Sequence, residues 1–216
     1  VSGSNNGSSR YDNFVTCFGP GTLIDAPGGA RPVEDFVAGD LVTTRDHGAL
    51  PLRWIARRTV DGTNGFAPVR FAPGAIGNHS DLLVSQQHRI LIQHPVAELL
   101  FDTPEVLVAA KALCGLPGID LGPETEITYS HLMFDSHQIV RSNGVWTESF
   151  FLGKNAVGGL DDAARAELTA MYPSLPVALS SFGPTMARTL TTAETALLHS
   201  SLQRADALGS GLSIAA

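Results

Sequence analysis

The feature that most constrains the fold is a series of short apolar runs between Cys17 and Phe151, broken by glycine, proline, aspartate and asparagine. Several runs are rich in β-branched or aromatic residues, which suit the half-buried surface of a strand. Because the runs recur about every ten residues with turn residues between them, they predict an all-β unit. The candidate strands are residues 22–25, 40–45, 51–60, 68–72, 82–84, 89–93, 105–109, 126–134, 137–141 and 145–150.

The composition differs at both ends of this unit. Residues 1–14 begin with a Ser/Gly/Asn-rich stretch typical of a flexible linker, so we expect an upstream segment there and the ordered β domain over residues 15–153. Residues 154–216 predict a mostly helical or irregular extension. One helix is expected over residues 160–168, and a second should begin at the Thr191–Glu194 capping pattern and end near Ala207.

Composition and charge exclude several classes of function. The 216 residues are 44% hydrophobic and 16% charged, which is a globular composition. With a net charge of −7 and no basic run, nucleic acid is not an expected partner. No apolar stretch reaches the length of a membrane span. The chain starts without Met or a signal peptide, so we expect a piece of a longer product.

Cys17 is the residue around which the candidate chemistry gathers. A thiolate beside its own N-terminal peptide bond can attack the Thr16 carbonyl and convert the amide into a thioester. The reaction needs a deprotonated thiol, donors for the oxyanion and a proton for the departing Cys17 nitrogen. His88 is the expected donor of that proton, and Ser85 the residue that orients the amide. The alternative is that Cys17 is a small buried apolar residue and His88 a satisfied strand histidine.

Two further histidines, His131 and His137, flank Asp135 late in the β unit. One of them is a candidate to take the thiol proton or to assist later hydrolysis. Histidine is also the commonest metal ligand, but no clear third ligand accompanies this pair. The only other cysteine, Cys114, lies far from Cys17 without a CxxC pair, so neither a disulfide framework nor structural zinc is expected. We expect no metal and no cofactor.

Together these blocks resemble a Hint domain, the module shared by Hedgehog autoprocessing domains and inteins, and in particular its bacterial branch within larger host proteins. The resemblance covers about residues 15–150. The Cys17 block resembles the motif whose leading cysteine performs an N-to-S acyl shift. Residues 85–88 resemble the Thr-x-x-His block, with Ser85 in place of threonine. His131 stands where inteins often place aspartate, and His137 falls on a later block histidine. The resemblance implies a horseshoe-like all-β disc of pseudo-twofold design with Cys17 at its centre.

The end of the resembling region departs from the intein pattern. Inteins end in His-Asn followed by Cys, Ser or Thr, whereas Asn143-Gly144 runs here into residues 147–149, Thr-Glu-Ser, without that pair. Asn143 lies too early to cyclise, so full splicing is not expected.

We therefore predict single-turnover, autocatalytic cleavage in which the chain's own upstream polypeptide is the substrate. A thioester forms at the Thr16–Cys17 bond, and water or another nucleophile then releases the upstream segment, with His131 as the late acid/base. Two alternatives stay open. In the first alternative, the chain is a Hint-fold module that no longer cleaves and serves as a structural or interaction domain. In the second, it is a cysteine hydrolase that uses Cys17 and His88 on a separate substrate.

Overall fold

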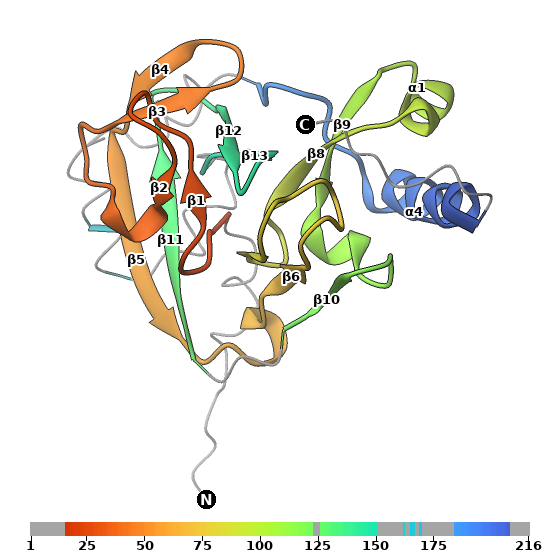
Figure 1. Ribbon diagram of the computed structural model, residues 1–216, viewed down its shortest axis with the longest axis horizontal. Helices are drawn as coiled ribbons and strands as arrows, with labels where there is room; N and C mark the ends of the chain where they lie inside the picture. The colour runs from red at the N-terminus through yellow and green to blue at the C-terminus, as the bar shows by residue number, and fades with distance from the viewer. Residues whose placement is uncertain are drawn as a thin grey trace, which may run out of the picture.

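The structure, a computed structural model, is built mainly from short strands (Figure 1). It describes residues 16–122, 126–150 and 184–207, with four positions between 151 and 183. The strands are β1 (Leu23–Ile24), β2 (Arg31–Pro32), β3 (Leu41–Thr44), β4 (Gly48–Pro51), β5 (Trp54–Val60), β6 (Val69–Phe71), β7 (Leu82–Val84), β8 (Arg89–Gln93), β9 (Glu105–Ala109), β10 (Ile119–Leu121), β11 (Ile127–Met133), β12 (Ile139–Ser142) and β13 (Val145–Glu148). The helices are α1 (Pro95–Phe101), α4 (Thr192–Ala207) and the 3₁₀ turns η2 (Val33–Asp35), η3 (Asn64–Phe66) and η4 (Ala110–Leu113).

The strands form one large sheet and two smaller ones. The large sheet has the order β2-β1-β12-β13-β8-β9, with β3 paired to both β12 and β4. The smaller sheets are β10-β6-β7 and the long antiparallel pair β11-β5. Phe18 joins the two smaller sheets, because its backbone bridges both Val84 of β7 and Ser130 of β11. The residue that follows Cys17 is therefore fixed in the centre of the β structure.

The predicted all-β fold class is confirmed, and each of the ten candidate runs overlaps a strand. Three strands were not predicted: β2, β4 and β10, of two to four residues each. The short helix α1 was also missed. It begins with Pro95 after His94, whose Nδ1 accepts a hydrogen bond from the Val96 N–H at 3.1 Å. Asn143 and Gly144 take left-handed backbone angles, φ 47° and 91°, and form the tight turn between β12 and β13.

The C-terminal helix α4 was predicted and is confirmed. Its start carries the expected capping box: Thr191 N–H donates to Glu194 Oε2 at 2.8 Å, and Glu194 N–H donates to Thr191 Oγ1 at 3.3 Å. α4 lies beside α1 at one end of the molecule (Figure 1), and its Leu198 and Leu202 belong to the main apolar core. The expected upstream segment and most of the first expected helix lie outside the described residues.

Residues 188–190 pair with Leu107 at the β9 edge of the large sheet through one isolated parallel bridge. Leu107 N–H donates to the Arg188 carbonyl at 2.7 Å, and Leu190 N–H donates to the Leu107 carbonyl at 3.2 Å. The C-terminal region thus pairs the backbone N–H and carbonyl of Leu107 at this strand edge. In the described part of the chain, no helix has the length and apolar character needed to cross a bilayer.

Candidate active site

Cys17 is held by the turn at residues 85–88. Its N–H donates to Ser85 Oγ at 3.1 Å, and its carbonyl accepts from Ser85 N–H at 3.1 Å and from His88 Nδ1–H at 2.9 Å. The turn itself is fixed, because His88 N–H donates to the Ser85 carbonyl at 3.0 Å and Gln86 Nε2 donates to the Asn64 carbonyl at 2.8 Å. Both sides of the nucleophile's backbone are therefore anchored by the two predicted residues.

His131 contacts both groups that would react, the Thr16 carbonyl and the Cys17 thiol. Its Nδ1 lies 2.9 Å from the Thr16 carbonyl oxygen, and its Nε2 lies 3.8 Å from Cys17 Sγ. A carbonyl oxygen can only accept, so Nδ1 carries the ring proton and Nε2 presents a lone pair to the thiol. One imidazole thus faces the electrophile through a donor and the nucleophile through an acceptor.

Aromatic packing fixes the ring of His131. Trp54 stacks on it with centroids 6.2 Å apart and planes at 16°, and Phe150 meets it edge-on at 5.6 Å. The pairing of β5 with β11 brings Trp54 to this place, since Trp54 lies opposite Met133 in the ladder. Rings so packed hold few alternative rotamers, which orients the imidazole toward the peptide bond.

Burial keeps the thiol protonated. Cys17 is 6% exposed, and burial raises its pKa to about 12 against the smaller opposing effects of a hydrogen bond with Ser85 and the charge of Arg58. A thiolate is therefore scarce at neutral pH. Attack on the Thr16 carbonyl requires that a base take the proton as the sulfur approaches.

His88 is neutral in the folded protein. Burial lowers its pKa to about 4, although the nearby charge of Glu148 and the hydrogen bond to Cys17 oppose the change. Its Nδ1 proton is directed at the Cys17 carbonyl oxygen rather than at the Cys17 nitrogen. Its Nε2 is buried and has no hydrogen-bond partner among the residues that the structure describes. His88 therefore contacts Cys17, as expected, but at the carbonyl oxygen and not at the predicted backbone nitrogen.

Glu148 is a site residue that the sequence analysis missed. It is fully buried on β13, where its Oε1 accepts from the Thr16 hydroxyl at 2.9 Å and its Oε2 accepts from Arg89 Nη1 at 3.0 Å. Thr16 and Glu148 are 132 positions apart in sequence, and no local motif connects them. The only available signal was the charged residue within the otherwise apolar and hydroxyl-bearing run 145–150.

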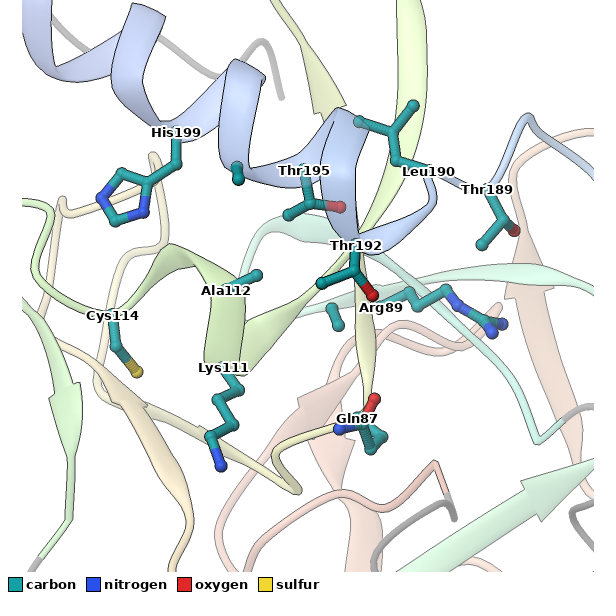
Figure 2. A pocket seen from close by; sticks show the side chains of 12 residues that line it. Gln87, Arg89, Lys111, Ala112, Cys114, Thr189, Leu190, Thr192, Thr195 and His199 are labelled. Atoms are coloured by element: carbon teal, nitrogen blue, oxygen red, sulfur yellow. The ribbon is translucent and has the colours of Figure 1, made fainter.

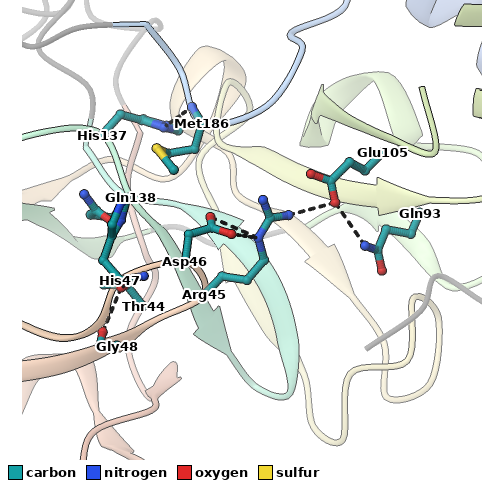
Figure 3. Close-up of polar contacts among 10 residues, drawn as sticks. All are labelled: Thr44, Arg45, Asp46, His47, Gly48, Gln93, Glu105, His137, Gln138 and Met186. Atoms are coloured by element: carbon teal, nitrogen blue, oxygen red, sulfur yellow. Dashed lines mark hydrogen bonds and ion pairs between the residues drawn. The ribbon is translucent and has the colours of Figure 1, made fainter. Parts of the chain in front are cut away.

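His137 is hydrogen-bonded to the Glu148 carboxylate. Its Nε2 lies 3.3 Å from Glu148 Oε2, while its Nδ1 accepts from the Met186 N–H at 3.1 Å (Figure 3). Because Nδ1 accepts, Nε2 carries the proton and donates to Glu148. His137 is thus joined to Thr16 through Glu148, and the C-terminal segment fixes its tautomer.

A cavity of about 470 Å³ lies beside α4 (Figure 2). Arg89, Lys111 and Thr195 are among the residues that line it, and so is the half-buried Cys114. Arg89 connects this cavity with the candidate active site, because its guanidinium also binds Glu148. In the described ranges, no group of three histidine, cysteine or acidic residues is arranged to hold a metal ion.

Asn143 serves the fold. Its Oδ1 accepts from the Leu23 N–H at 2.7 Å, and its Nδ2 donates to the Asp81 carbonyl at 2.6 Å. The side-chain amide is therefore engaged with β1 and with the residue before β7, in the turn where the backbone has a positive φ.

The sequence model of the Hint domain matches residues 16–154. Among solved structures, the chain is similar to the gp41-1 intein, at 14% identity over 61% of this chain and 97% of that one, with a TM-score of 0.41. It is also similar to a bacterial intein-like domain from Clostridium thermocellum, at 13% identity over 62% and 97%, with a TM-score of 0.39. No curated protein matches the sequence.

The match over residues 16–154 spans more than half of the chain. The chain therefore belongs to the Hint domain family. This makes it an autoprocessing-type domain.

Proposed function

We propose that the chain cleaves itself in cis at the Thr16–Cys17 bond, through an N-to-S acyl shift followed by release of the upstream segment without splicing. The observation that carries the proposal is the position of His131 between the Thr16 carbonyl oxygen, at 2.9 Å, and Cys17 Sγ, at 3.8 Å. Intramolecular attack gains most of its advantage from such positioning.

In the first step, the thiol proton moves to Nε2 of His131 and Sγ bonds to the Thr16 carbonyl carbon. The oxyanion that forms accepts the Nδ1–H of the same ring, whose positive charge strengthens that hydrogen bond. The sequence predicted His131 as the late acid/base. We also assign it the thiol proton in this first step, and its contacts with the Thr16 carbonyl oxygen and with Cys17 Sγ support that assignment.

In the second step, the bond between the Thr16 carbon and the Cys17 nitrogen breaks. Ser85 lies 3.1 Å from that nitrogen and is also hydrogen-bonded with the thiol. We assign it the transfer of a proton to the nitrogen, with replacement from protonated His131. His88 holds the Cys17 carbonyl. It is neutral, and its one ring proton is engaged with the Cys17 oxygen, so we assign it an anchoring role in place of the expected proton donation.

In the third step, water or another nucleophile attacks the thioester. The carbon–sulfur bond breaks, the Cys17 thiol is restored, and residues 1–16 leave with a carboxyl group when water attacks. Nothing in these steps uses a metal or a cofactor.

The direct test is intact-mass spectrometry of the purified chain with and without dithiothreitol. We expect loss of residues 1–16, accelerated by the added thiol and abolished in Cys17→Ala. Cys114→Ala is the matched control, because it removes the other cysteine and should cleave at the same rate. Cleavage by Cys17→Ala would contradict the proposal.

The dependence on protein concentration separates cleavage in cis from a hydrolase that acts on another molecule. A first-order rate constant that does not change with concentration supports the cis reaction. The buried state of Cys17, 6% exposed, also favours it, since a separate substrate needs an open approach to the thiol. A rate constant that rises with concentration would favour the hydrolase.

A further inference from the structure

Within the described ranges, Glu148 accepts four hydrogen bonds, and one of them comes from the segment that would be cleaved off. Oε1 accepts from Thr16 Oγ1 at 2.9 Å and from Arg89 N–H at 3.0 Å. Oε2 accepts from Arg89 Nη1 at 3.0 Å and from His137 Nε2 at 3.3 Å. The donors from Arg89 and His137 belong to the folded domain, whereas Thr16 is the last residue before the scissile bond.

The carboxylate is charged and saturated. Burial opposes its ionisation, but the hydrogen bond from His137 and the charge of Arg89 outweigh burial and hold its pKa below the usual value. A group with a lowered pKa and every oxygen engaged is a poor proton acceptor at neutral pH. Glu148 is therefore suited to hold a hydroxyl in place and unsuited to act as the base for hydrolysis.

The contact also lies close to the reaction. The Thr16 hydroxyl and the Thr16 carbonyl oxygen belong to one residue, and they are bound at the same time by Glu148 and by His131. With both groups fixed, the carbonyl is presented to the thiol in one orientation. Thr16 is only 8% exposed, so its side chain has little room to find another partner.

We propose that Glu148 is the specificity-determining residue for the position before the nucleophile, and that it selects a side chain with a hydroxyl group. The inference rests on the proposed function and deepens it, because it names the class of upstream sequence that this domain cleaves. Arg89 and His137 are positioning residues that hold the carboxylate. The Met186 N–H, in the C-terminal segment, keeps the His137 proton on Nε2.

The test compares thiol-induced cleavage of chains that differ at position 16. Thr16→Val keeps the shape of the side chain but leaves Glu148 Oε1 with one donor fewer, so we expect cleavage to be slower by about tenfold or more. Thr16→Ser restores the hydroxyl and should recover most of the lost rate. Thr147→Val is the control for loss of a buried hydroxyl: the Thr147 hydroxyl bonds Ser142 on the same sheet. Equal rates for Thr16→Val and the unaltered chain would overturn the proposal.

A second variant assigns the selection to Glu148 itself. Glu148→Gln keeps an acceptor but removes the charge, and a neutral hydrogen bond is about half as strong as one to a carboxylate. The factor by which Thr16→Val slows cleavage should therefore be smaller in a Glu148→Gln chain than in a chain that keeps Glu148. An unchanged factor would assign the selection to another residue.

A third measurement separates this inference from the proposed function. In Cys17→Ala, which cannot form the thioester, Thr16→Val should lower the urea midpoint of unfolding and Thr16→Ser should lower it less. This result would support the Glu148 contact even if the unaltered chain released no fragment. Equal midpoints for Thr16→Val and its Cys17→Ala parent would overturn the contact.

Discussion

At the scale of single residues, each group around the scissile bond is polar and buried, and its neighbours decide its protonation state. The thiol of Cys17 is held neutral by burial, His88 is held neutral by burial, and Glu148 is held charged by Arg89 and His137. A neutral Cys17 thiol beside His131, whose Nε2 presents a lone pair to it, gives a stable resting state. The reaction then begins with proton transfer at the moment of attack.

The state of His88 predicts an acid sensitivity of the fold. Its pKa is lowered from 6.5 to about 4 in the folded protein, so the unfolded chain binds the additional proton between those values. Stability from this group is complete above pH 6.5 and falls as the pH drops toward 4. Between about pH 7 and pH 5 the loss is about 2 kcal/mol.

We expect His88→Gln to lose about that much less free energy of unfolding than the unaltered chain over the same interval. Urea unfolding at about pH 7 and pH 5 measures both differences. Identical losses in the two chains would contradict the assignment of a neutral buried His88.

Some of these residues could be predicted from the sequence and others could not. Cys17, Ser85 and His88 belong to short motifs, and the motifs correspond to a local turn that holds the nucleophile. Glu148 contacts Thr16 only because β13 crosses the centre of the large sheet, and no local pattern carries that information. The hydrogen bond from His88 to the Cys17 carbonyl oxygen likewise depends on tertiary packing.

At the scale of elements, the approach of the Cys17 segment to β7 positions the nucleophile. Gly19 N–H donates to the Leu83 carbonyl at 2.8 Å. A Cβ added at Gly19 would lie 2.6 Å from Leu83 Cβ and 2.9 Å from the Leu83 carbonyl oxygen. Glycine is required here by the close contact between two backbones.

Gly19→Ala should therefore displace the chain next to Cys17. We expect a loss of about 1–3 kcal/mol of unfolding free energy and slower cleavage, because the Cys17 N–H moves relative to Ser85. Gly28→Ala is the matched control, since a Cβ there would meet no atom within 4 Å. Urea unfolding and intact mass measure the two effects. A Gly19→Ala chain as stable as Gly28→Ala would contradict the account.

The strands with long β-branched or apolar runs could be predicted because period and composition agree over several residues. β2 is Arg31–Pro32 and β10 contains Asp120, so neither shows the unbroken apolar run of the equally short β1 and β7. They form because partner strands lie beside them. α1 is seven residues long, with its cap supplied by a histidine side chain. Histidine is not among the usual capping residues, so the signal was weak.

At the scale of the whole molecule, the C-terminal helix is part of one core. Leu198 and Leu202 of α4 are fully buried in the cluster that also contains Phe18 and Val84. Residues 188–190 also pair with Leu107 of β9, and the Met186 N–H donates to His137. The C-terminal region thus contributes both apolar packing and a contact that leads to the scissile bond.

This arrangement predicts that α4 unfolds together with the β domain. Leu198→Ala should cost about 2–5 kcal/mol and shift a single unfolding transition, whereas Leu197→Ala, at a side chain 47% exposed, should change stability by less than about 0.5 kcal/mol. Circular dichroism and tryptophan fluorescence, followed in the same urea titration, measure helix and core. Two separate transitions would contradict a shared core.

The measurement that tests the central claim most directly is capture of the thioester at Thr16. Hydroxylamine attacks a thioester and leaves a hydroxamate on the acyl residue, which intact-mass and fragment spectra locate. The account predicts residues 1–16 with a hydroxamate on Thr16 from the unaltered chain and from Cys114→Ala, and none from Cys17→Ala. A folded, unaltered chain that yields no Thr16 hydroxamate after prolonged treatment would contradict the account.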